Sequence, residues 1–132
     1  MIRQSAITDA LKAHLAELPG KPPVVWENAD GDLPAAELYF IVQSVHIEPA
    51  RITMDGVHRY TGLLQVTVVV PAGKGTRIAD DQAWAVSQHF YGQVFEAGGG
   101  RLRITDQPHI RDGYQDGVRW RVPCLIRFTA IA

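Results

Sequence analysis

The segment Gly73-Lys74-Gly75-Thr76 contains residue types that bind phosphate in many proteins. Backbone N–H groups of a glycine-rich turn, together with a lysine and the start of a helix, can hold an anion. The complete phosphate-loop signature requires serine or threonine directly after the lysine and a further glycine upstream, and the chain has neither. The segment therefore does not predict nucleotide binding.

Other groups with catalytic or metal-binding potential are scattered along the chain. The five histidines lack the i, i+4 spacing of a helical metal site, and no serine lies in a Gly-x-Ser-x-Gly turn. The only cysteine, Cys124, lies in an apolar run, which predicts a buried, unreactive thiol. The acidic segment Asp30-Gly31-Asp32 lacks the spaced oxygen ligands of an EF-hand, so we interpret it as a solvated loop. No catalytic site, metal site or cofactor is expected.

A group of arginines is the clearest charged feature in the second half of the chain. It consists of Arg101, Arg103, Arg119, Arg121 and Arg127, which alternate with apolar residues. Such alternation places the arginines on the outer face of their strands. They form either a solvated sheet face whose charges discourage aggregation, or a basic face that contacts an acidic partner or passing DNA.

The composition is that of a small domain of ordinary charge. The 132 residues suit one domain, 1–132, and 46% of them are hydrophobic, which is enough for a core. With 13 basic and 14 acidic residues the chain is nearly neutral, which argues against a dedicated nucleic-acid or membrane-surface binder. No apolar run approaches the roughly 20 residues of a membrane span, and no signal-peptide pattern is visible, so we expect folding in a cytosol.

The stretch from Arg59 to Phe95 organises the predicted fold. Residues 60–70 alternate in polarity and are rich in β-branched types, as in a half-buried antiparallel strand. Pro71 ends that strand, and a helix is expected from Thr76 to the glycines at 98–100. The buried stripe of this helix consists of Ala79, Ala83, Val86, Phe90 and Val94.

A second stripe on the same predicted helix lies nearly opposite the first and consists of Trp84, Tyr91 and Phe95. A helix with a single core face needs no such stripe. Two interpretations remain open. Either the N-terminal helix or a loop covers these aromatic side chains, or they are buried between subunits, where Trp and Tyr are enriched.

The first half of the chain supplies a helix and two strands. The helix is expected at residues 1–18, and a short strand at residues 24–27. The strand at residues 38–48 is apolar on both faces around Tyr39, which places it centrally in the sheet or beneath a neighbouring chain. Ile52 and Met54 lie at the tip of the following hairpin and are candidate contacts.

Three further strands are expected after the second helix, at residues 101–104, 108–111 and 118–131. Pro123 predicts that the last of them is an edge strand or contains a bulge. The resulting order is α-β-β-β-α-β-β-β, with hairpins between neighbouring strands. This order favours an α+β, two-layer domain in which two helices pack on a mostly antiparallel sheet.

Four segments together resemble the phage tail terminator-like proteins, which are similar to the tail terminator of long-tailed, non-contractile phages. The segments are the helix ending near Leu18-Pro19, Gly62-Leu63-Leu64-Gln65-Val66-Thr67-Val68, Val70-Pro71-Ala72-Gly73-Lys74-Gly75-Thr76 before a helix with Ala79, Ala83 and Phe90, and Trp120-Arg121-Val122-Pro123-Cys124-Leu125-Ile126-Arg127-Phe128. The resemblance spans nearly the full chain, and its motifs are structural rather than catalytic.

The resemblance implies a non-enzymatic morphogenetic protein without a cofactor. Such proteins assemble into a hexameric ring that caps the tail tube, stops its elongation and offers the surface on which the head docks. The implied partners are further copies of the chain, the tail tube protein and a head-completion protein, with passing contact with DNA and none with a membrane. The chain can remain monomeric in dilute solution. The implied location is the virion tail, after assembly in the host bacterial cytoplasm from a phage or prophage gene.

Two alternatives remain. One is a head-tail connector or minor tail protein. The other, from a different class, is a small-ligand-binding α+β domain with a pocket between sheet and helix. Its polar groups would come from Tyr39, His46, Tyr60 and His89. Convergent titratable groups in a deep pocket would favour ligand binding, whereas concentration-dependent oligomers would favour assembly.

Overall fold

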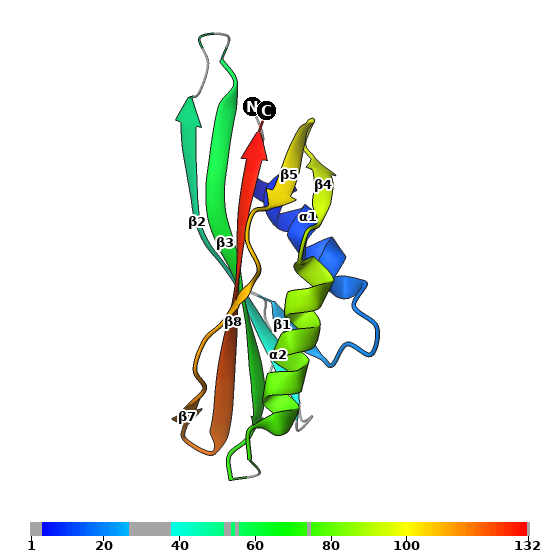
Figure 1. Cartoon of the computed structure of the whole chain (residues 1–132), viewed down its shortest axis with the longest axis vertical. Coiled ribbons are helices and arrows are strands. Elements are labelled where there is room, and N and C mark those ends of the chain that lie inside the picture. The colour runs from blue at the N-terminus through cyan, green and yellow to red at the C-terminus, as the bar shows by residue number, and fades with distance from the viewer. Residues whose placement is uncertain (1–3, 27–37, 52–53, 55, 74, 132) are drawn as a thin grey trace.

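The computed structural model describes residues 4–26, 38–51, 54, 56–73 and 75–131 (Figure 1). For residues 44–51 it describes the backbone alone. The first half contains α1 (Gln4–Ala16), β1 (Val24–Trp26), β2 (Tyr39–Arg51) and β3 (His58–Pro71). The second half contains α2 (Arg77–Phe90), β4 (Val94–Ala97), β5 (Gly100–Ile104), β6 (His109–Ile110), β7 (Tyr114–Asp116) and β8 (Arg119–Ile131). The α+β class expected from the sequence is confirmed.

The strands form one sheet in the order β1-β2-β3-β8-β5-β4, and β6 and β7 also pair with β8. Strand β8 is central. It pairs with β3 along its whole length on one side, and with β7, β6 and β5 in turn on the other. All pairings are antiparallel except that of β1 with β2, which is parallel. The expected hairpin between these first two strands is therefore wrong.

Both helices lie on the same face of the sheet, as Figure 1 shows, and the main core fills the space between. On β3, alternate residues from Leu64 to Val70 point into this core, as the period of two predicts. The helices contribute Ile7, Leu11 and Leu15 from α1, and Ala79, Ala83, Val86 and Phe90 from α2. Full burial of each large aliphatic side chain contributes about 1.5–3 kcal/mol, so this face dominates the stability of the fold.

A smaller buried group lies on the opposite face of the sheet. Tyr39 and Val69 are direct cross-strand neighbours there and are 1% and 0% exposed. Thr67, at 4% exposed, shares their face, and the Arg119 guanidinium lies 5.5 Å from the centre of the Tyr39 ring. The expectation that the start of this strand is covered on both sides is thus confirmed within a single chain.

The region after α2 differs from the sequence-based expectation. The helix ends at Phe90 instead of continuing to the glycines at 98–100, and Val94–Ala97 forms β4. Gly92 has a φ of 72°, a conformation that glycine adopts without strain and that turns the chain out of the helix. Strand β7 was also not expected, so five strands follow α2 instead of three.

Pro123 does not mark an edge. It lies opposite Thr67 in an unbroken register with β3, so β8 is a central strand. The carbonyl of Pro123 accepts a hydrogen bond from the Arg111 N–H at 2.9 Å, on the side away from β3. In an antiparallel strand the N–H and C=O of a residue point to the same side. The missing N–H of Pro123 therefore removes nothing from the β3 ladder.

His14 and His89 join the two helices. Their rings stack with centroids 4.0 Å apart. Nε2 of His14 lies 2.7 Å from the His89 carbonyl oxygen, and Nε2 of His89 lies 2.5 Å from the His14 carbonyl oxygen. Because a carbonyl only accepts, each Nε2 carries a proton and donates. The two bonds tie the C-terminal turns of α1 and α2 to each other.

The environment of His14 favours its neutral form. Burial lowers the pKa of His14 below its usual 6.5, and the neighbouring His89 acts in the same direction. The hydrogen bond to the His89 carbonyl and the carboxylate of Glu17, 4.0 Å from Nδ1, oppose this shift.

Acidification from about pH 7.5 to about pH 5.5 is expected to lower the melting temperature of the wild type more than that of His14→Gln. A histidine whose pKa is lowered by folding binds protons more readily in the unfolded chain, so stability falls as the pH drops through 6.5 toward the folded pKa. Glutamine can donate to the same carbonyl but does not titrate. Thermal melts followed by circular dichroism measure the difference, and exposed His109→Gln should keep the wild-type dependence. Equal pH dependence in His14→Gln and the wild type would contradict the assignment.

Candidate interaction surfaces

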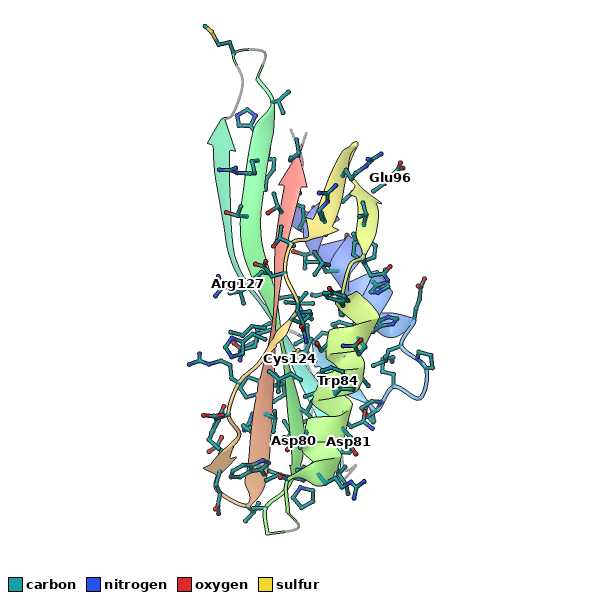
Figure 2. The ribbon with its side chains drawn as sticks, viewed as in Figure 1. Asp80, Asp81, Trp84, Glu96, Cys124 and Arg127 are labelled. Carbon is teal, nitrogen blue, oxygen red and sulfur yellow. The ribbon has the colours of Figure 1, made fainter. Side chains whose placement is uncertain are left out.

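The outward face of α2 is an exposed aromatic surface. Trp84 is 53% exposed, and Tyr91, at the C-terminal end of the helix, is 55% exposed. Figure 2 shows Trp84 along α2 with Asp80 and Asp81 one turn nearer its N-terminus. Ile78, 60% exposed, extends the apolar part of this face. Neither the N-terminal helix nor a described loop buries Trp84 or Tyr91, so this surface is available to a partner.

Phe95 does not belong to the same surface, contrary to the expected stripe. It lies on β4, where it pairs with Leu102 of β5, and it is half-buried against the core. Its ring centroid lies 4.7 Å from that of His14 in α1. The interpretation that the N-terminal helix covers these aromatic residues thus holds for Phe95, because the chain leaves the helix before reaching it.

The other expected contact residues of the first half differ in accessibility. Tyr39 is buried in its own chain, which removes it from the accessible surface. Met54 is 93% exposed beyond the ends of β2 and β3. Ile52 lies outside the described residues. Of the two that the structure describes, Met54 is therefore accessible to solvent and Tyr39 is not.

The expected basic face is divided into two parts. Arg101, Arg103 and Arg127 are exposed on the sheet face opposite the helices, around the C-terminal half of β8. Figure 2 shows Arg127 on the side of the sheet away from α2. Arg119 and Arg121 lie toward the N-terminal end of β8, where each has a neighbour. Arg121 Nε is 3.0 Å from Asp116 Oδ2, and Arg119 lies over Tyr39.

The first part contains a fourth arginine that the sequence analysis did not single out. Arg59 of β3 pairs with Ile131, which in turn pairs with Arg101, so the three share one row across the sheet. Together these strands line a shallow groove of about 680 Å³. The groove residues are Arg59, Thr61, Arg101, Arg103, Thr105, Thr129 and Ile131. The sequence could have indicated the orientation of Arg59. It lies two residues before Thr61, so in a strand both side chains point to the same outer face of β3.

The described residues do not assemble a catalytic constellation. Cys124 is buried as expected, and burial raises the pKa of its thiol to about 12. Among the described residues, no three His, Cys, Asp or Glu side chains gather closely enough to hold a metal ion. Within the same residues, no helix is both long and apolar enough to cross a membrane.

The polar residues proposed for a ligand pocket are not brought together. Tyr39 lies on the outer face of the sheet, whereas Tyr60 belongs to the core beneath the helices. His89 is engaged with His14. The side chain of His46 lies outside the described residues. No observation on these residues favours the ligand-binding alternative.

Comparison with known proteins gives a consistent result. A family model described as "Phage tail terminator protein" matches residues 6–128. One similar solved structure carries a sequence identifier instead of a functional description. It is 25% identical, has a TM-score of 0.72, and the match covers 98% of this chain and 96% of that one. A second, described as "Virion of native gene transfer agent (GTA) particle", is 20% identical with a TM-score of 0.66, and covers 99% and 96%. No protein of curated function matches the chain.

Phe95→Ala is expected to lower the free energy of unfolding by about 2 kcal/mol, because it removes a half-buried ring from the contact between β4 and α1. Trp84→Ala and Tyr91→Ala should each change it by less than about 0.5 kcal/mol, because both side chains are exposed. Urea denaturation of the three variants at low protein concentration measures these values. A loss at Trp84 as large as that at Phe95 would show that Trp84 is part of the core.

Proposed function

The chain belongs to the phage tail terminator family, and on that basis we propose that it caps the tail tube of a phage or prophage particle, stops its elongation and provides the surface on which the head docks. The match over residues 6–128 carries this proposal, because it includes both helices and nearly the whole sheet. A structural role in phage tail assembly follows from the family. The similarity to a protein of a gene transfer agent virion supports a place in a tailed particle.

The proposed protein works as a hexameric ring through its surfaces, without a cofactor or a catalytic step. A ring needs two different patches on each subunit, because its interfaces join unlike surfaces head to tail. The aromatic face of α2 and the arginine-lined groove satisfy this need, since they lie on opposite sides of the sheet. The exposed Met54 lies beyond the main body of the sheet and is a candidate contact to the tail tube protein or a head-completion protein.

The proposed location is the virion tail, with assembly in the cytoplasm of the host bacterium. Contact with passing DNA is the alternative role for the arginines on the outer sheet face, and it requires that this face line the lumen of the ring instead of joining two subunits. For such a ring we expect the isolated chain to remain monomeric in dilute solution. A subunit in an incomplete ring lacks one of its two neighbours, so small oligomers are less stable than the closed assembly.

Deleting the gene from an inducible phage or prophage that carries it is expected to give overlong tails without attached heads. Electron microscopy of negatively stained lysates measures tail length and head attachment. Complementation with the wild-type gene should restore both. Trp84→Ala should complement poorly, whereas Tyr114→Ala should complement fully, since Tyr114 is an aromatic residue of similar exposure, 47%, on β7 away from α2.

The same measurement separates the two roles in tail assembly. Tails of normal length that lack heads would identify a head-tail connector and overturn the capping function. Tails of normal length with heads attached would overturn both the terminator role and the connector role. A change in tail length is therefore the result that only a terminator predicts.

A further inference from the structure

The groove on the outer sheet face holds a set of positive charges without acidic partners. No ion pair joins Arg59, Arg101, Arg103 or Arg127 to an acidic side chain within the residues that the structure describes. We propose that this groove binds the outward face of α2 of a second copy of the chain, and that this contact is the repeating interface of the assembly. The inference rests on the self-association proposed above and specifies which surfaces meet.

The arginines are arranged in successive rows across β3, β8 and β5. One row reads Arg59, Ile131, Arg101, and the next Thr61, Thr129, Arg103. In the third row Leu63 pairs with Arg127, whose carbonyl accepts a hydrogen bond from the Thr105 N–H at 3.4 Å. Successive rows are about 7 Å apart, and neighbouring strands about 5 Å. Guanidinium groups thus surround a strip in which hydroxyl and apolar side chains alternate.

The outward face of α2 has the complementary character. It presents the carboxylates of Asp80 and Asp81 one turn from the exposed side chain of Trp84 (Figure 2), and Ile78, near the start of the same helix, is also exposed. The exposed ion pair at this end of the helix joins Arg77 to Asp81 at 3.9 Å and does not include Asp80. Carboxylates can accept hydrogen bonds from guanidinium groups in pairs, which favours arginine at such contacts. The apolar groups of this face would cover Ile131, which is 45% exposed and lies between Arg59 and Arg101 in the groove.

The position of the two surfaces suits a closed ring. The helix lies on one face of the sheet (Figure 1), and the residues that line the groove point from the other, so each subunit can bind one neighbour through each face. Contacts between unlike patches generate rings or filaments, whereas a contact between like patches would stop at a dimer. Although the chain as a whole is nearly neutral, the proposed interface joins a basic groove to an acidic helix face, and these attract each other.

The groove suits a protein better than DNA. It contains the apolar side chain of Ile131 between Arg59 and Arg101, and the acidic Glu96 of β4 lies directly across from Arg101 on the same face. A phosphate backbone would leave the exposed Ile131 side chain uncovered. A helix with both apolar and acidic side chains could bury Ile131 and keep its carboxylates near the arginines.

Reciprocal charge reversal tests this pairing. Arg101→Glu/Arg103→Glu and Asp80→Lys/Asp81→Lys should each weaken self-association by about tenfold or more, because each places like charges opposite one another. The two variants mixed together should assemble again, since each supplies the surface that the other needs. A chain carrying all four changes should also recover. Sedimentation velocity over a wide concentration range measures the assembly, and association of the wild type should weaken in high salt.

Controls keep the result specific to the interface. Arg111→Glu reverses another exposed arginine, outside the groove, and should leave assembly unchanged. Far-ultraviolet circular dichroism and thermal melts at low concentration should show folded monomers for every variant, because all the changed side chains are exposed. Trp84→Ala should also weaken association. Charge reversal on the groove should not restore it, because the lost contact is apolar.

Three outcomes would overturn the pairing. The first is a wild-type chain that stays monomeric at every concentration. The second is normal assembly of either charge-reversed variant. The third is loss of assembly that neither mixing nor the fourfold variant restores. If Arg101→Glu/Arg103→Glu assembles normally but no longer retains a labelled DNA duplex, the groove is a nucleic-acid surface instead. Tail length after gene deletion is measured separately, so failure of the pairing and failure of the capping function give different results.

Discussion

Strands β3 and β8 pair without interruption from Arg59 opposite Ile131 to Pro71 opposite Arg119, and every other part of the fold is positioned by this ladder. Its inner face carries Leu64, Val66 and Val68 on one strand and alternate apolar residues on the other, and α2 lies directly on this face while α1 packs beside it on α2 and β4. A slip of one residue would turn each of these side chains toward solvent. The register therefore decides at once where the core is and which residues of the outer face become neighbours.

Much of this ladder was predictable, because strict alternation of polarity over so many residues fits a half-buried strand and does not fit a helix. Residues 60–70, the start of α2 and the burial of Cys124 all followed from local pattern. Strand β4 did not, because Val94 and Phe95 continue the helical spacing of the residues before them, and only the turn at Gly92 separates them from α2. The central position of Pro123 in the sheet was also not predictable from the sequence. It depends on which neighbouring strand the Pro123 carbonyl faces, and that is decided by the strand order.

The candidate surfaces were harder to predict than the core. Alternation correctly placed the arginines outward, but it could not show that Arg59 joins Arg101 in one row while Arg119 lies over a buried tyrosine. Which exposed residues act together is decided by pairing between strands that are far apart in the sequence. For a protein whose family works by assembly, the information about function lies in these long-range neighbours more than in any motif.

The central place of β8 also has a consequence for the order of events during synthesis. Of the described strands β8 is synthesised last, yet it supplies the partner for β3 and for three strands that precede it. Until it arrives, β3 has one open edge, and β5, β6 and β7 have no partner in the main sheet. Pairings of such large sequence separation form slowly. Until β8 is synthesised, the nascent chain therefore exposes an unpaired edge of β3, a feature that favours binding by chaperones.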